Sequence, residues 1–109
     1  MKTIKIATDY TRFPGGRLIS DGKFSAQEFR QKFLEPLFSN KSDAENILID
    51  LDDVEGFSTA FLEEVFGGLV RIVGKARVLE MLTFKCDDEP LLIEEIKRYI
   101  DMADGNESK

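Results

Sequence analysis

The stretch at residues 56–70 reads Gly-Phe-Ser-Thr-Ala-Phe-Leu-Glu-Glu-Val-Phe-Gly-Gly-Leu-Val and is the most informative part of the sequence. It closely follows Ile-Leu-Ile-Asp-Leu at 47–51, a short apolar run typical of a buried β-strand. From Phe61 onward, apolar residues recur at three- and four-residue spacing, which predicts an amphipathic helix over about 59–74. The sequence therefore predicts a strand, a hydroxyl-bearing turn and a helix whose first amides are unpaired and partly positive.

Signals on either side extend this unit into a chain of strands and helices. Ser25 and Glu28 form a capping box that begins one helix, and Pro36 is expected to end or kink it near Leu34. A proline–glycine turn at 14–16 is expected to join the first two strands as a hairpin. In chain order, the prediction is strands at 3–7 and 17–21, a helix at 25–34, a strand at 46–51, a helix at 59–74, a strand at 77–85 and a helix at 89–105.

This order, β-β-α-β-α-β-α, predicts a single α/β domain over residues 1–104. Its sheet is expected to be mixed, with four or more strands, helices flanking it and the 47–51 strand at its centre. Residues 105–109 are expected to form a flexible tail. Gly67 and Gly68 each cost a helix about 1 kcal/mol relative to alanine, so we expect another backbone to pass close to them.

Composition narrows the classes of function. The 109 residues carry a net charge of −6, which argues against binding to nucleic acid or to an anionic membrane, because both require clustered cations. No apolar run approaches the roughly 20 residues of a membrane helix. The absence of histidine excludes Ser-His-Asp, Cys-His and histidine–zinc chemistry, and we expect no cofactor. The single cysteine, Cys86, fits a reducing, cytoplasmic compartment and is expected to be unreactive.

Two segments resemble a known family. Residues 12–38 contain Arg-Phe-Pro-Gly-Gly-Arg, Asp-Gly and Ser-Ala-Gln-Glu-Phe-Arg, and residues 50–70 contain Phe-Leu-Glu-Glu-Val-Phe-Gly-Gly-Leu. Together they resemble the bacterial STAS-like domains, named for their similarity to sulfate-transporter and anti-sigma-factor-antagonist domains. The resemblance covers about residues 3–100 and implies a non-enzymatic regulatory module that binds a protein partner. In anti-sigma-factor antagonists, that partner is a histidine-kinase-like ATPase in a partner-switching system.

The same resemblance directs attention to the turn after the central strand, where a STAS antagonist carries a hydroxyl that its partner kinase phosphorylates. By this resemblance, Ala60 stands at the acceptor position and Phe61 at the position of the following glycine. The nearest hydroxyls belong to Thr59 and Ser58, which are therefore the candidates for a phosphorylation switch. Either can also act simply as a helix cap that contributes about 1 kcal/mol.

A basic loop supplies an alternative function. Arg12 and Arg17 enclose Gly15 and Gly16. The loop is either a plain hairpin connection in which the glycines adopt positive φ, or a clamp in which two guanidiniums and a close backbone bind an anion. Used with the helix start at 58–61, such a clamp would make the chain an anion- or nucleotide-sensing domain.

Acidic residues near the turn are the expected partner surface, and they comprise Asp52, Asp53, Glu55, Glu63 and Glu64. The two glutamates at 63 and 64 point about 100° apart on a helix, so they are not expected to work as a catalytic pair. A salt bridge from one of them to a basic residue is compatible with the sequence, which does not choose among three candidates: Arg12, Arg17 and Arg30.

A third hypothesis is a magnesium-dependent phosphohydrolase. Asp50 and Asp52 form the Asp-x-Asp sequence that ends a strand in enzymes of the haloacid-dehalogenase type, where the first aspartate is a nucleophile and the pair binds magnesium. Those enzymes open on this motif, whereas two predicted strands and a helix precede it here. The simpler interpretation is a strand end with solvated acids, and no catalytic or metal-binding residue is assigned.

Overall fold

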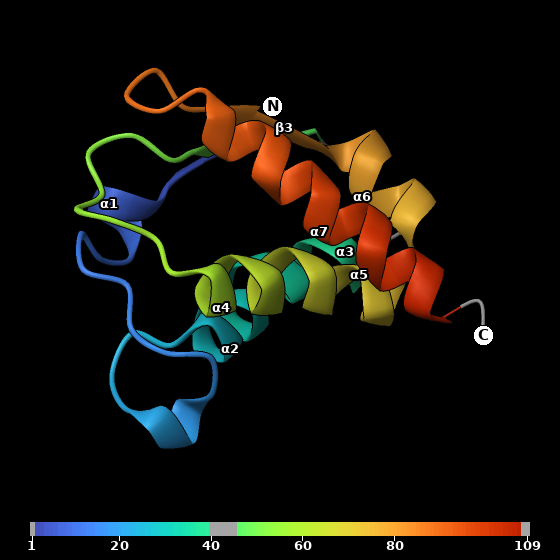
Figure 1. Cartoon of the computed structure of the whole chain (residues 1–109), viewed down its shortest axis with the longest axis horizontal. Coiled ribbons are helices and arrows are strands. Elements are labelled where there is room, and N and C mark those ends of the chain that lie inside the picture. The colour runs from blue at the N-terminus through green and yellow to red at the C-terminus, as the bar shows by residue number, and fades with distance from the viewer. Residues whose placement is uncertain (1, 40–45, 108–109) are drawn as a thin grey trace.

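Three short parallel strands form the sheet in the computed structural model, which describes residues 2–39 and 46–107 (Figure 1). In spatial order they are β1 (Lys2–Lys5), β2 (Ile47–Asp50) and β3 (Leu82–Lys85). The strand predicted at 47–51 is central, which confirms that expectation. The prediction of a mixed sheet with four or more strands is wrong for the described residues, because both strand pairs are parallel and the sheet has three strands.

The predicted strand at 17–21 is absent from the described structure, and so is the hairpin. From β1 the chain enters the short helix α1 (Ile6–Asp9), crosses a loop and forms the 3₁₀ turn η1 (Ile19–Asp21). The carboxylate of Asp21 accepts a hydrogen bond from the amide of Leu18 at 2.9 Å. This local bond closes a turn and competes with the extended backbone that a strand needs.

Gly15 is required for a close approach of two backbone segments. Its amide donates to the carbonyl oxygen of Phe24 at 2.8 Å, and a Cβ at this position would collide with the carbonyl oxygen of Lys23. The positive φ expected of a hairpin turn occurs at neither Gly15 nor Gly16. The glycines therefore serve close packing here.

Two helices cross beneath the sheet, and each contains a π-helical turn. The first consists of α2 (Ala26–Phe29), the π-helical η2 (Arg30–Leu34) and α3 (Glu35–Ser39). The second consists of α4 (Thr59–Leu62), the π-helical η4 (Glu63–Gly67) and α5 (Gly68–Val73). Both begin where the sequence predicts, because Ser25 Oγ accepts from the amide of Glu28 and Ser58 Oγ accepts from the amide of Phe61.

Pro36 does not end the first helix at Leu34, since the helix continues to Ser39. Pro36 lies in the first turn of α3, directly after a π-helical turn, where a missing amide donor is tolerated. The π-helical turn before Pro36 therefore allows the helix to continue where the sequence predicts a break.

The segment predicted as a strand at 77–85 divides into a helix, α6 (Lys75–Met81), and the strand β3. Gly74 separates α6 from α5 with a φ of 95°, and Val78 and Met81 then face the core at helical spacing. The last helix, α7 (Leu91–Glu107), passes the predicted stop at 105, so three residues of the expected tail are helical. Residues 108–109 lie outside the described residues.

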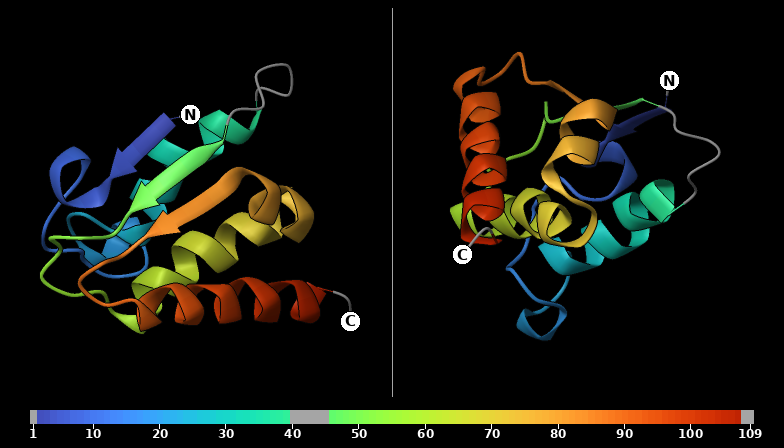
Figure 2. Two further views of the ribbon diagram at one scale, coloured as in Figure 1. Left: turned by 90° about the horizontal axis from the view of Figure 1, so that it is seen from above. Right: turned by 90° about the vertical axis from the view of Figure 1, so that its right-hand side faces the viewer.

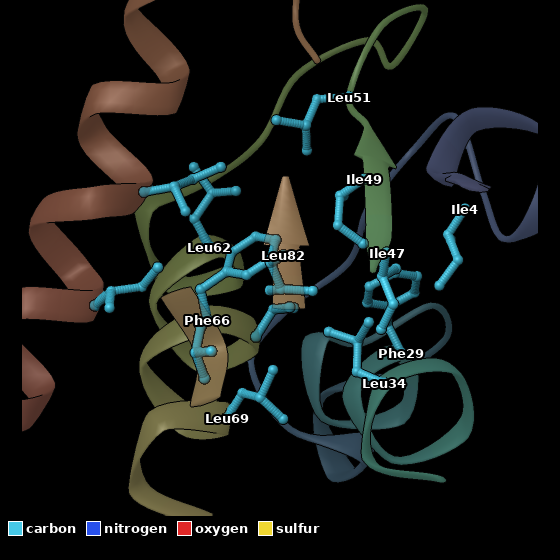
Figure 3. Close-up of a cluster of buried hydrophobic side chains, with 14 of the residues drawn as sticks. Ile4, Phe29, Leu34, Ile47, Ile49, Leu51, Leu62, Phe66, Leu69 and Leu82 are labelled. Atoms are coloured by element: carbon cyan, nitrogen blue, oxygen red, sulfur yellow. The ribbon is translucent and has the colours of Figure 1, made fainter. Parts of the chain in front are cut away.

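The helices pack on one face of the sheet. Ile4, Ile47, Ile49 and Leu82 are buried, and Figure 3 shows the core that they form with side chains of the helices. Buried side chains of the helices in this core include Phe29, Phe61, Phe66, Leu69, Ile96 and Ile100.

The opposite face of the sheet carries Thr3 and Thr83, and both are exposed. Figure 2 (left) looks down on this face, with no helix drawn in front of the strands. None of the helices in the described ranges combines the length and the apolar character that a bilayer crossing requires.

A side chain, not a second backbone, explains the glycine pair at 67–68. The guanidinium of Arg30 lies against Gly68, and a Cβ there would come within 2.5 Å of Arg30 Nη1. A Cβ on Gly67 would come within 2.6 Å of Glu63 Oε2 instead. The expectation of a passing backbone is thus wrong, and the space serves ion pairs.

Gly68→Ala is expected to lower the free energy of unfolding by about 1–3 kcal/mol, because the guanidinium of Arg30 is enclosed and cannot move aside. This figure is the net change, because the clash with Arg30 costs more than the gain of about 1 kcal/mol that alanine brings to a helix. Gly67→Ala is the matched control, and we expect it to be neutral or stabilising, since the carboxylate of Glu63 is partly exposed and can rotate. Urea unfolding measures both variants, and equal effects would contradict this explanation.

Candidate functional site

Arg12 fixes the start of the basic loop to the turn that follows β2. Its carbonyl oxygen accepts from the amide of Glu55 at 2.9 Å, and its Nη2 donates to Glu55 Oε2 at 2.8 Å. Its Nε also donates to the carbonyl oxygen of Asp53 at 3.3 Å. The ion pair is more than half exposed and contributes at most about 1 kcal/mol, so the backbone bonds do most of the positioning.

Arg17 fixes the end of the same loop to the second helix. Its Nη1 lies 2.5 Å from Glu63 Oε1 and 3.1 Å from Glu64 Oε1. Arg71 Nη1 donates to the other oxygen of Glu63 at 2.8 Å. Hydrogen bonds from Arg71, and then from Arg17, hold the pKa of the Glu63 carboxyl below its ordinary value. Of the three candidate partners of these glutamates, Arg17 is one that the structure pairs with both.

Arg30 joins the two crossing helices beneath this loop, and only 9% of its side chain is exposed. Its Nη1 donates to Glu64 Oε2 at 2.5 Å and to the carbonyl oxygen of Glu64 at 3.0 Å. Its Nε donates to Glu35 Oε2 at 2.8 Å. Glu64 thus binds Arg30 with one carboxylate oxygen and Arg17 with the other.

The contact between Arg30 and Glu64 joins the two π-helical turns, because η2 begins at Arg30 and η4 contains Glu64. Such turns are rare and often occur at functional sites. The sequence leaves Arg30 as one of three possible partners of these glutamates, and no sequence pattern indicates that Arg30 also pairs with Glu35. The unexplained glycine pair was the signal that a large group needed space there.

Ser58 and Thr59, the candidate switch hydroxyls, are both exposed. Ser58 is the N-cap of α4, since its Oγ accepts from the amide of Phe61 at 3.0 Å. Thr59 is the first helical residue. Ala60, at the position of a STAS acceptor, is partly buried, so the accessible hydroxyls are the two that precede it.

Neither predicted clamp residue bonds to the helix start at 58–61 in the described structure, and the charges of both are already paired. Arg12 binds Glu55, and Arg17 binds Glu63 and Glu64. An anion bound by these guanidiniums would have to displace carboxylates.

Asp52, predicted as part of an exposed partner surface, is buried, with 6% of its surface exposed. Its Oδ1 accepts from the amide of Asp88 at 2.9 Å, and its Oδ2 accepts from Lys85 Nζ at 2.6 Å. The backbone bond from Asp88, followed by the bond from Lys85, holds the pKa of Asp52 below its ordinary value of 3.8. Of the acidic residues in this turn, only Asp53 and Glu55 are exposed.

Asp50 also belongs to the turn structure, because its Oδ1 accepts from the amide of Asp52 at 3.0 Å. Within the described residues, 2–39 and 46–107, no group of three or more His, Cys, Asp or Glu residues is placed to hold a metal ion. Cys86 is buried, and burial raises the pKa of its thiol.

Comparison with known proteins identifies one family. Residues 25–91, more than half of the chain, match the family model described as a STAS-like domain of unknown function. The matched segment contains both crossing helices, β2 and the Arg30–Glu64 contact. No curated protein and no solved structure matches the chain. The resemblance indicated by the sequence is thus confirmed.

Asp52→Asn keeps the shape of the side chain and removes its charge. Because folding lowers the pKa of Asp52, its carboxylate stabilises the fold above pH 3.8, and this contribution is lost as the pH falls through the folded-state pKa. We expect the variant to be less stable than the wild type near pH 7, and the difference to shrink in acid. Urea unfolding from pH 7 down to pH values below 3.8 measures the difference in stability between the two proteins. A difference that stays the same in acid would contradict the role of the charge.

Proposed function

The chain belongs to the STAS-like domains of unknown function, and from that premise we propose that it is a non-enzymatic regulatory module that binds a protein partner. Its docking site is the loop–helix surface, which we define as the exposed parts of residues 12–24 and 53–64. The observation that carries the proposal is the pairing of Arg17 with Glu63 and Glu64, which holds a projecting loop beside the helix start. Figure 1 shows this loop, with η1 at its tip, extending from the rest of the domain.

The loop exposes several large apolar side chains to solvent. Phe13 is 65% exposed, and three further large apolar side chains on the loop are also exposed: Leu18, Ile19 and Phe24. Exposed apolar side chains gathered on one segment commonly mark a protein-interaction site.

The loop is also held in one shape. The amide of Ile19 donates to Gln27 Oε1 at 2.9 Å, and the amide of Gln27 donates to the carbonyl oxygen of Arg17 at 3.0 Å. A preorganised loop loses little conformational entropy when it binds, which favours a docking role.

The partner class follows from the resemblance to anti-sigma-factor antagonists, which act on histidine-kinase-like ATPases. A phosphate on Thr59 or Ser58 would add nearly two negative charges at a helix N-terminus, where negative charge is locally favourable. The fold would then persist while the charge of the docking surface changes. In this proposal the phosphate works as an interface switch in a bacterial cytoplasm, to which a single unpaired cysteine is suited.

The alternatives receive less support from the same geometry. The anion-sensing function would use Arg12 and Arg17, and both already have carboxylate partners. The phosphohydrolase would use Asp52 near a metal, and both oxygens of Asp52 are engaged by Lys85 and by the amide of Asp88.

Photo-crosslinking tests the docking site. A photoreactive residue placed at Thr59 is expected to capture the partner in cells, whereas one placed at Thr3, on the open face of the sheet, is the control. With the captured partner purified, Thr59→Asp should weaken binding at least about tenfold in calorimetry, by adding charge to the interface. Thr3→Asp should bind like the wild type.

Thermal unfolding separates binding from stability, because aspartate is favourable in the first turn of a helix and the Thr59→Asp variant should remain folded. A Thr59→Asp variant that binds like the wild type, or crosslinks that form from Thr3 alone, would place the interface elsewhere.

A further inference from the structure

A groove runs along the edge of β3 that faces away from β2. It holds about 290 Å³ and is lined by six residues of α6, β3 and α7: Leu79, Leu82, Thr83, Phe84, Ile93 and Lys97. We propose that this groove binds an extended peptide segment of a protein partner. The segment adds to β3 as a further strand and sets a carboxylate against Lys97. This site is separate from the loop–helix surface.

The backbone of β3 supplies the pairing groups. Leu51 donates its amide to the carbonyl oxygen of Lys85 at 2.8 Å, in continuation of the β2–β3 ladder. In a parallel ladder, alternate residues direct both their N–H and their C=O toward the same neighbour. Thr83 and Lys85 therefore bond to β2, and Phe84 directs its N–H and C=O toward the groove. In the sheet as described, β3 is an edge strand, and such an edge is a template for an added strand.

The walls of the groove are apolar. Leu79 is 47% exposed, which is high for a large apolar residue, and Phe84 and Ile93 are only partly buried. Peptide sites that work by strand addition combine main-chain bonds with pockets for alternate side chains. A strand laid along β3 would direct alternate side chains onto Leu79 and Ile93.

Lys97 gives the groove its charge preference. Its side chain is exposed, and no hydrogen bond or ion pair joins it to another residue in the described ranges. An unpaired ammonium on the rim of an apolar groove favours a carboxylate on the incoming segment. An acidic side chain, or the carboxyl group that ends a chain, provides it.

The length of β3 favours a flexible segment over a second copy of this chain. β3 has four residues, so an edge-to-edge pair of such strands is short. Two copies joined only there would bury much less than the about 800 Å² per partner that stable complexes use. A flexible peptide can instead fill the groove and pair with the strand edge together.

The test uses a display library of random peptides of about eight residues, selected on the folded protein. Enriched peptides are expected to combine alternating apolar residues with an acidic residue. When a selected peptide binds the ¹⁵N-labelled protein, hydrogen exchange of the Phe84 amide should slow at least about tenfold. The Thr83 amide, already bonded to β2, should change little. Peptides without an acidic preference, or unchanged exchange at Phe84, would overturn the proposal.

Two variants of α7 test the charge. Lys97→Glu should weaken binding of the selected peptide at least about tenfold, and peptides selected on this variant should be enriched in basic residues. Arg98→Glu makes the same charge change at an exposed position outside the groove and should bind like the wild type. Equal loss in both variants would overturn the role of Lys97. Hydrogen exchange of the Phe84 amide is also measured without peptide at several protein concentrations. If exchange slows as the concentration rises, the strand edge pairs with a second copy of the chain, and the peptide proposal is overturned.

Discussion

A nearly enclosed guanidinium, that of Arg30, determines how the two crossing helices meet. A charge removed from water needs close partners, and Arg30 has the carboxylates of Glu35 and Glu64 and the carbonyl oxygen of Glu64. Gly68 leaves the space that the guanidinium fills. Each helix forms a π-helical turn at this contact, so the helix geometry and the ion pair depend on each other.

The same contact extends to the surface through shared carboxylates. Glu64 binds Arg30 on one oxygen and Arg17 on the other, and Arg17 also binds Glu63. The position of the projecting loop therefore depends on an interaction inside the domain. In functional terms, a rigid interior connection holds the apolar loop and the hydroxyls of the helix start in one arrangement. Under the proposed function, a phosphate on Thr59 changes binding without changing the fold.

The sequence predicts the features that depend on neighbouring residues. The apolar run at 47–51 gives the central strand, and the serine caps give both helix starts, because each needs only local signals. Prediction fails where a specific bond decides between two local structures, as at 17–21, where the carboxylate of Asp21 holds the amide of Leu18. It also fails at 77–85, where burial of Val78 and Met81 at helical spacing extends the helix before the strand begins.

The candidate site was predicted in its residues but not in its pairing. Arg17 and Glu63 are 46 positions apart, and Arg30 and Glu64 are 34 positions apart. No local pattern indicates which arginine finds which carboxylate, so the loop arginines could equally be expected to bind an anion. The cost of the glycine pair at 67–68 is visible in the sequence, but the cause at Gly68 is Arg30, a side chain of another helix.

A double-mutant cycle of Arg30→Met and Glu64→Leu measures how strongly the buried ion pair organises the contact between the two helices. The two single variants each leave a charged partner behind, whereas the double variant removes both. If the pair organises the helix crossing, urea unfolding should give a coupling free energy of about 2 kcal/mol or more between the two sites. Additive effects, with a coupling below about 0.5 kcal/mol, would show that the helices meet through apolar packing alone and that the ion pair does not organise their contact.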